Sequence, residues 1–255
     1  MKLALILPTA YLDLCLEYSD GVQICLAQEV LRDKDGYGDF YRKLSNTLGE
    51  YVILNNGCAE NILLGNGSIQ YVTSYVNPNC VCLQDVGYNC RATVYQTYKM
   101  SSEIGDEPGY HRMVIAQGET LAQWTSCLEW LEYIKPEMFG VTRMRKLRTQ
   151  RYTRRVYVKR ILQRYPTAQI HLLGWDTTDS GVGCAVGQDF TGNIVSIDTC
   201  KPFVFAYHGV EAKDLAKDQI YLRRPENYFD IPRGKVDLSL LKYNIEVFRR
   251  AAHGD

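Results

Sequence analysis

Residues 194–200 read Ile-Val-Ser-Ile-Asp-Thr-Cys, and this stretch bears most directly on the fold. An apolar run ends abruptly in the carboxylate of Asp198, and small polar residues follow it. Such an ending is typical of a strand that displays a nucleophile or a general base at the mouth of a parallel β/α barrel. The alternative interpretation is a surface aspartate that caps an ordinary turn.

Apolar runs with helical patterns between them recur along the chain. We expect strands at Leu3–Leu7, Tyr51–Leu54, Val81–Leu83, Met113–Ala116, Glu137–Val141, Gln169–Leu173, Ile194–Ile197 and Phe203–Phe205. We expect helices at Val22–Leu31, Thr120–Leu131, Tyr152–Tyr165 and Leu238–Ala252. Strands that alternate with helices predict an α/β fold, here a single-domain (β/α)8 TIM-type barrel over residues 1–255. Residues 207–235 are expected to form a loop over the barrel mouth, and residues 236–255 the terminal helix.

The composition narrows the class of protein. The chain has 255 residues, 46% of them hydrophobic, and a formal net charge of +0. It is therefore long enough for one globular core, and the molecule as a whole carries no electrostatic bias. No segment reaches the roughly 18 apolar residues that a membrane-spanning helix needs, so no membrane partner is expected.

The nine cysteines show neither metal-binding nor secreted-type spacing. No Cys-x-x-Cys or His-x-x-x-His pair occurs, so we expect no metal. Free thiols are typical of a reducing compartment, which indicates a cytoplasmic protein. No Gly-x-Gly-x-x-Gly motif follows the first strand, which argues against a dinucleotide-binding fold, and no cofactor is expected.

A basic tract occupies residues 143–164 and contains no acidic residue. A solvated helix normally mixes acidic and basic residues four positions apart, so these charges need partners from elsewhere. A nucleic-acid backbone is the partner that we favour, and acidic residues from another part of the fold are the alternative. The residues expected to contact phosphates are Arg143, Arg145, Lys146, Arg148, Arg151, Arg154, Arg155 and Lys159, with Arg160 and Arg164 completing the tract.

Polar groups stand at the ends of five expected strands. They are Asn55-Asn-Gly-Cys-Ala-Glu60, Gln84-Asp85, Gln117-Gly118, Gly174 and Asp198-Thr-Cys200. In order and rough spacing they resemble the motifs of the tRNA-guanine transglycosylase family, over roughly residues 50–206. They are most similar to the short phage-type branch of that family, which is linked to 7-deazaguanine modification of DNA.

The resemblance implies a barrel enzyme that exchanges guanine in a nucleic acid for a 7-deazaguanine base. It makes Asp198 the nucleophile that attacks C1′ of the nucleoside, and Asp85 the carboxylate that reads the N–H groups of the base. Gln117, Gly118 and the backbone of Gly174 become further substrate-binding groups. These roles suit the chemistry, because a carboxylate accepts two adjacent donors and a glycosyl ester divides one hard displacement into two easier ones.

The implied partners are therefore a nucleic acid and a 7-deazaguanine base. Family members are often dimers, so a homodimer is a further implied partner. Longer members carry a cysteine-rich zinc site after the barrel, and no such ligand set follows Asp198 here. This difference favours DNA as the substrate over tRNA without deciding between them.

The chain also departs from the family pattern at Asn55, where the family has an aspartate. An amide cannot act as a base near neutral pH, so proton transfer falls to another group, with Glu60 or Asp176 as candidates, or the chain is slow or inactive. We keep Asn55 and Glu60 with Asp198 as candidate catalytic residues.

Two other functions remain open on the sequence alone. The first is a non-catalytic nucleic-acid-binding protein or partner subunit that keeps the barrel, which Asn55 favours. The second is an unrelated barrel enzyme for a small phosphorylated substrate, with Ser180-Gly-Val-Gly183 as its phosphate site. If the protein has the base-exchange function that the family resemblance implies, the expected loop would clamp a flipped-out nucleotide. The residues for this contact are Tyr207, His208, Arg223, Arg224 and Tyr228.

Overall fold

The computed structural model describes residues 1–57, 64–105, 109–142, 154–175, 192–213 and 222–254. The strands are β1 (Lys2–Leu5), β2 (Val22–Leu26), β3 (Tyr51–Asn55), β4 (Cys80–Cys82), β5 (His111–Ile115), β6 (Met138–Thr142), β7 (Gln169–Leu173) and β8 (Ile194–Thr199). The α-helices are α1 (Leu12–Glu17), α2 (Ala27–Arg32), α3 (Asp39–Lys43), α4 (Asn66–Val76), α5 (Cys90–Ile104), α6 (Leu121–Leu131), α7 (Arg154–Arg164), α9 (Lys201–Tyr207) and α10 (Leu238–His253). Shorter helical turns are η1 (Thr9–Tyr11), η2 (Lys34–Gly38), η3 (Leu44–Leu48), η5 (Glu132–Ile134) and η7 (Tyr228–Asp230).

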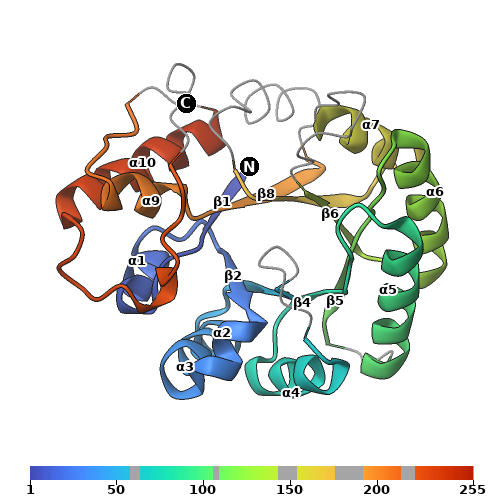
Figure 1. Cartoon of the computed structure of the whole chain (residues 1–255), viewed down its shortest axis with the longest axis horizontal. Coiled ribbons are helices and arrows are strands. Elements are labelled where there is room, and N and C mark those ends of the chain that lie inside the picture. Colours follow the sequence, from blue (N-terminus) through green and yellow to red (C-terminus); the bar gives the residue numbers. More distant parts are fainter. Residues whose placement is uncertain (58–63, 106–108, 143–153, 176–191, 214–221, 255) are drawn as a thin grey trace. The chain divides into compact units, whose positions relative to one another are not determined.

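The strands form one eight-stranded sheet in the order β1-β8-β7-β6-β5-β4-β3-β2 (Figure 1). The pairs β1–β8, β3–β4, β4–β5 and β5–β6 are all parallel, and the register sets Ala4 opposite Asp198. Strands in this order, connected by helices, define the α/β (β/α)8 TIM-type barrel fold. The fold class expected from the sequence is therefore confirmed.

Two elements differ from the sequence prediction. Residues 22–31 were expected to form one helix, but the structure has the strand β2 followed at once by α2. Every residue of β2 is buried, so the strand lacks the alternation that would reveal it. Phe203–Phe205 was expected to be a strand and belongs to α9, whose residues 202–206 are all buried, so this helix has no polar face.

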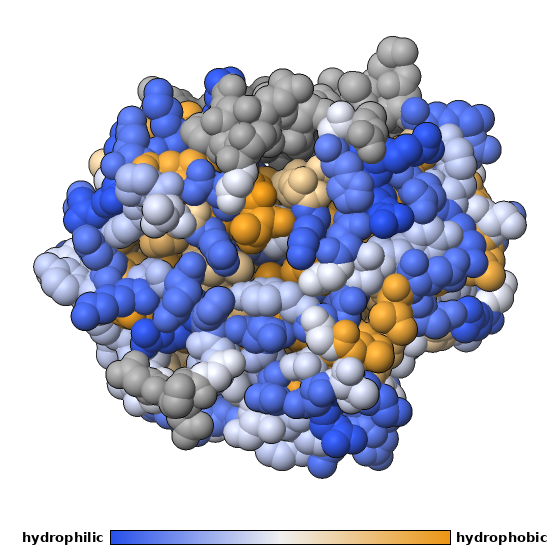
Figure 2. Space-filling model, turned by 180° about the vertical axis from the view of Figure 1, so that it is seen from behind, coloured by the Kyte–Doolittle hydropathy of each residue, from blue (hydrophilic) through white to orange (hydrophobic). Residues whose placement is uncertain are grey.

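The chain forms two compact units: unit 1 is Met1–Gln23 with Leu172–Asp255, and unit 2 is Ile24–His171. In unit 1 the ring of Phe203 packs edge-on against Tyr11, with ring centroids 5.1 Å apart. In unit 2 the ring of Trp124 lies 4.7 Å from that of Tyr157, which joins α6 to α7. The single-domain organisation stays a prediction. On the face that Figure 2 shows, hydrophilic residues predominate and hydrophobic residues form separate groups.

The segment expected to be a loop over the barrel mouth is in part tightly packed. Tyr207 belongs to α9, and residues 214–221 lie outside the described ranges. The Tyr228 hydroxyl donates to the carbonyl of Ile6 at 2.6 Å, directly after β1, and Tyr228 is only 2% exposed. Its ring therefore cannot stack on a nucleotide, and Tyr228 of η7 lies against the carboxyl end of β1.

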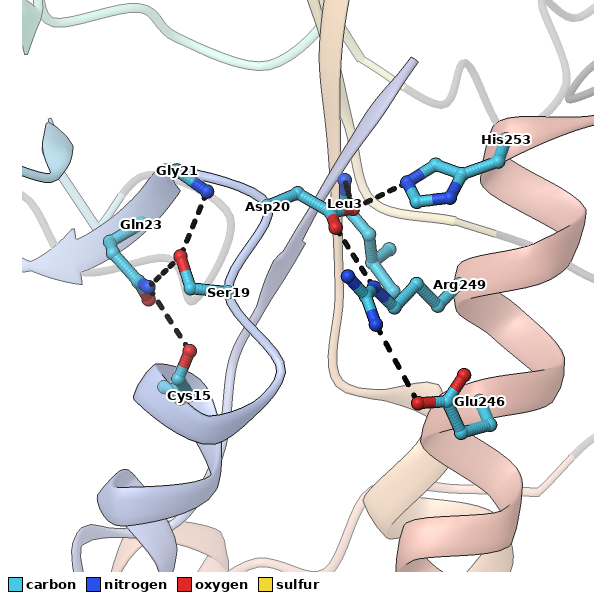
Figure 3. A network of polar contacts seen from close by, with 9 residues as sticks. All are labelled: Leu3, Cys15, Ser19, Asp20, Gly21, Gln23, Glu246, Arg249 and His253. Carbon is cyan, nitrogen blue, oxygen red and sulfur yellow. Dashed lines mark hydrogen bonds and ion pairs between the residues drawn. The ribbon is translucent and has the colours of Figure 1, made fainter.

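A polar cluster around Asp20 fastens β1 to α10 within unit 1 (Figure 3). Asp20 Oδ2 accepts from the Leu3 backbone N–H at 2.9 Å and lies 2.8 Å from His253 Nε2. Asp20 Oδ1 accepts from Arg249 Nε at 2.9 Å, and Arg249 also meets Glu246 at 3.6 Å. Burial raises the pKa of Asp20, but the bonds from Leu3, Arg249 and His253 together hold it below its usual value. Among the described helices, none is long and apolar enough to cross a membrane.

Candidate active site

Asp198 lies near the carboxyl end of β8 and is 3% exposed. Its Oδ1 accepts a hydrogen bond from the Gly174 backbone N–H at 2.6 Å. Both residues belong to unit 1, and each follows the apolar part of its strand. The bond fixes the orientation of a buried carboxylate at the strand end where barrel enzymes carry their catalytic groups.

Gly174 follows β7 with φ +72°, in the left-handed region that glycine adopts without strain. This conformation turns its N–H toward Asp198. The resemblance assigned the Gly174 backbone to the substrate base, whereas the structure shows this N–H bonded to Asp198. In the described state, Gly174 therefore positions the candidate nucleophile.

A second group of candidate residues comes together in unit 2, at the ends of β3, β4 and β5. Asp85 Oδ2 accepts from Gln117 Nε2 at 2.6 Å, and Asp85 Oδ1 accepts from Asn56 Nδ2 at 3.4 Å. Asn56 Nδ2 also donates to the Leu83 carbonyl at 2.9 Å. All three polar side chains are buried, with Asp85, Gln117 and Asn56 each 4% exposed. The result is an array of one carboxylate and two amides, which can present both acceptors and donors to a planar ligand.

Gln117 is held by two further contacts, one of its side chain and one of its backbone. Its Oε1 accepts from the Tyr88 backbone N–H at 3.2 Å, while its own backbone N–H lies 3.4 Å from Cys127 Sγ. Tyr88 has φ +61°, which is uncommon for a residue with a bulky side chain. Burial raises the pKa of Cys127 to about 12, so this residue is a thiol at neutral pH.

Gly118 has a packing role in the structure. A Cβ built at this position would lie 2.5 Å from the Trp124 backbone nitrogen and 2.8 Å from the carbonyl carbon of Gln123. Only glycine therefore lets the first turn of α6 approach the end of β5 so closely. This packing accounts for Gly118 without a contact to substrate and keeps Gln117 in place.

Asn55 ends β3 and is 6% exposed. Its Oδ1 accepts from the Gly57 backbone N–H at 3.0 Å, so the side chain closes the turn that begins the Asn55-Asn-Gly57 motif. Glu60, Asp176 and the Ser180-Gly-Val-Gly183 segment lie outside the described residues.

The basic tract is described from residue 154 onward, so Arg143, Arg145, Lys146, Arg148 and Arg151 lie outside the described ranges. Arg155 and Lys159 are exposed on α7, whereas Arg154 is 4% exposed, so it is not displayed to a phosphate as expected. Arg164 forms ion pairs with Glu132 and, at 3.9 Å, with Glu129 of α6. Acidic residues from elsewhere in the fold thus form ion pairs with part of the tract, as the alternative expectation had it.

Two residues of the unit 2 group were not singled out from the sequence. Asn56 was part of a quoted motif, and its role as a donor to Asp85 depends on the parallel alignment of β3 with β4. Tyr88 carries no sequence signal for its left-handed backbone. For Asn56, the one sequence signal was the Asn55-Asn-Gly57 run at the end of an apolar strand.

Within the described parts of the chain, no group of three or more His, Cys, Asp or Glu side chains is arranged to hold a metal ion. The sequence matches no protein-family model, and no curated protein is recognised as its relative. The function is therefore inferred from the geometry of the two residue groups.

Proposed function

We propose that this protein is a base-exchanging glycosyltransferase that replaces guanine in a nucleic acid by a 7-deazaguanine base. The proposal is carried by two buried carboxylates at strand ends, Asp198 near the carboxyl end of β8 and Asp85 after β4. Each accepts a hydrogen bond of 2.6 Å, from Gly174 N–H and from Gln117 Nε2 respectively. The resemblance in the order of the strand-end motifs supports assigning the two carboxylates different tasks.

Asp85 and Gln117 suit the recognition of a guanine-like base. Such a base carries N1–H and an exocyclic amine as adjacent donors, and a carboxylate has enough lone pairs to accept both while keeping a protein donor. A primary amide carries two N–H groups, one of which Gln117 uses on Asp85. The second is the donor that we assign to the base carbonyl O6.

Asp198 suits the covalent step. A carboxylate oxygen attacks C1′, the bond from C1′ to the base nitrogen breaks, and guanine leaves with that electron pair and takes up a proton. The incoming 7-deazaguanine base then attacks C1′ through its ring nitrogen, gives up the proton on that nitrogen and releases the carboxylate of Asp198. Two inversions keep the sugar anomer unchanged.

Incubation with labelled guanine and, separately, with duplex DNA, single-stranded DNA and tRNA tests the proposal. We expect label to enter one of these nucleic acids, and Asp198→Asn to reduce the rate at least about 10³-fold. Asparagine keeps an oxygen that can accept from Gly174 N–H, so the fold is expected to survive and a loss can be assigned to the nucleophile. No incorporation into any nucleic acid, or an unchanged rate in Asp198→Asn, would overturn the proposal.

Asn55 favours a second candidate function, a nucleic-acid-binding barrel without catalysis. The amide oxygen that closes the turn on Gly57 N–H does a structural task, and an amide cannot move a proton near neutral pH. Asn55→Asp separates the two candidates, because an aspartate can accept the same hydrogen bond. Exchange that is absent in the natural sequence and appears in Asn55→Asp would support the non-catalytic candidate. Exchange in the natural sequence would exclude it.

A further inference from the structure

A groove lies along α5 in unit 2, next to the loop that carries Asp85. Its volume is about 780 Å³, and its lining comes from α5 and from Trp130 of α6. The lining residues are Cys90, Arg91, Val94, Tyr95, Tyr98, Lys99, Ser102 and Trp130. The groove thus combines aromatic rings with two cations, and among the described residues that line it there is no carboxylate.

The exposed residues of the groove follow the helical repeat. Arg91, Tyr95 and Lys99 stand four positions apart on one face of α5, and all three are exposed. Tyr95 is 64% exposed and Trp130 is 57% exposed, unusually open positions for large aromatic rings. The Tyr98 hydroxyl donates to the Trp130 carbonyl at 2.8 Å, which connects the two helices that form the groove.

The groove stands in a fixed relation to Asp85, because the loop between β4 and α5 is bonded to the helix. Thr97 Oγ1 donates to the Gln84 carbonyl at 2.7 Å. Thr93 Oγ1 accepts from Val86 N–H at 2.9 Å and donates to the Val86 carbonyl at 3.0 Å. Tyr88, which is 41% exposed and whose N–H orients Gln117, lies in this loop between Asp85 and the start of the groove.

We propose that the groove binds a single-stranded segment of the substrate nucleic acid, next to the base that Asp85 reads. Bases stack on Tyr95 and Trp130, and phosphates are held by Arg91 and Lys99, the combination that non-specific single-strand binding uses. The inference rests on the proposed function and extends it, by naming where the strand runs beside the target base. A base must leave its stack to reach a buried carboxylate, so its neighbours are single-stranded too.

Charge favours a nucleic acid over a second copy of this chain as the occupant. A two-fold interface through the groove would bring Arg91 and Lys99 toward the same residues of the partner, and the described lining has no carboxylate to compensate them. Among the described carboxylates near the groove, Glu129 and Glu132 are engaged with Arg164. Glu103 stands four positions after Lys99 on α5 but does not line the groove. Two cations that share the described lining with no carboxylate suit an anionic strand.

Fluorescence anisotropy with an end-labelled single-stranded oligonucleotide, as DNA and as RNA, tests the inference. We expect Tyr95→Ala and Trp130→Ala each to weaken binding about tenfold or more. Tyr95→Phe keeps the ring and is expected to bind like the natural protein. Arg91→Ala combined with Lys99→Ala is expected to reduce the slope of log K against log salt by roughly 1.4.

Matched controls are Tyr243→Ala on α10 and Lys235→Ala, both at exposed positions of unit 1. They are expected to leave binding unchanged. If the natural protein binds the strand and the groove variants bind equally well, the inference about the groove is overturned while the proposed function stands. If it binds neither single-stranded DNA nor single-stranded RNA, the inference about the groove is overturned, and incorporation of labelled guanine decides the proposed function separately. If the groove variants change only the oligomeric state in light scattering, the groove is a self-association surface and the inference is overturned.

Discussion

Two buried carboxylates, Asp20 in unit 1 and Asp85 in unit 2, are stabilised in different ways. Asp20 meets the charged groups of Arg249 and the imidazole of His253, besides a backbone N–H. Asp85 accepts from the neutral amides of Gln117 and Asn56. Asp20 is hydrogen-bonded to Leu3 near the amino end of β1, whereas Asp85 follows the carboxyl end of β4.

The difference separates structural from functional use of the same side chain. An ion pair satisfies a carboxylate and fixes the elements around it, which suits the amino-terminal face of a barrel. Amide donors orient a carboxylate without neutralising its charge, so it can still accept hydrogen bonds from a ligand. Replacing each aspartate by asparagine measures this difference directly.

Of the two aspartates, Asp85 is expected to show the larger effect. In Asp85→Asn one of the two acceptor oxygens becomes an NH2 donor, which cannot accept from Gln117, from Asn56 or from a base. We expect kcat/KM for guanine exchange to fall about 10²-fold or more, because unpaired polar groups in a recognition site discriminate strongly. Steady-state kinetics with labelled guanine measures the change, and Asp20→Asn is the control that should exchange at the natural rate. An Asp85→Asn variant with the natural kcat/KM would show that Asp85, like Asp20, has no role in base recognition.

A smaller effect, on stability alone, is expected at Asp20. Asp20→Asn leaves Arg249 and His253 without their shared carboxylate, and we expect the free energy of unfolding to fall by about 1–2 kcal/mol, since Arg249 is partly exposed. Urea unfolding measures the change. Glu246→Gln is the matched control, because its contact with Arg249 at 3.6 Å lies between partly exposed side chains. Lost exchange activity in folded Asp20→Asn would show that the cluster serves the site as well.

The smallest effect is the pH dependence of the Asp20 cluster. The folded-state pKa of Asp20 lies below its ordinary value of 3.8. Its contribution to stability is therefore fully present above that value and is lost as the pH falls through the folded-state pKa. The stability difference between the natural protein and Asp20→Asn should shrink over this acid range. Urea unfolding at a series of pH values checks this, and a difference that stays constant would exclude the assignment.

The fold could be predicted because most strands are short apolar runs that end in polar residues. Ile194–Ile197 and Gln169–Leu173 are such runs, and both became strands. The prediction failed where burial removed the pattern. Fully buried β2 runs into α2 without a turn residue, so the two elements looked like one helix. In α9, apolar residues on all sides hid the helical period.

The candidate site could be predicted only as residue types at strand ends. Asp198, Asp85 and Gln117 were identified because each follows an apolar run. The bond from Gly174 N–H to Asp198, and the steric need for glycine at position 118, depend on distances that sequence spacing does not carry. Asn56 was missed as a partner because its contact to Asp85 joins the ends of two different strands, and the two residues are 29 positions apart in the sequence.

The Asp20 cluster also has a consequence for the order in which the chain folds during synthesis. Asp20 and His253 are separated by 233 residues, so the first residues of unit 1 wait for α10 before this contact can form. Unit 2 is one continuous segment, residues 24–171, and its contacts are available earlier. Domains and subdomains that are continuous in sequence can fold as they leave the ribosome. We therefore expect the array around Asp85 to assemble before β1 and β8 come together to present Asp198.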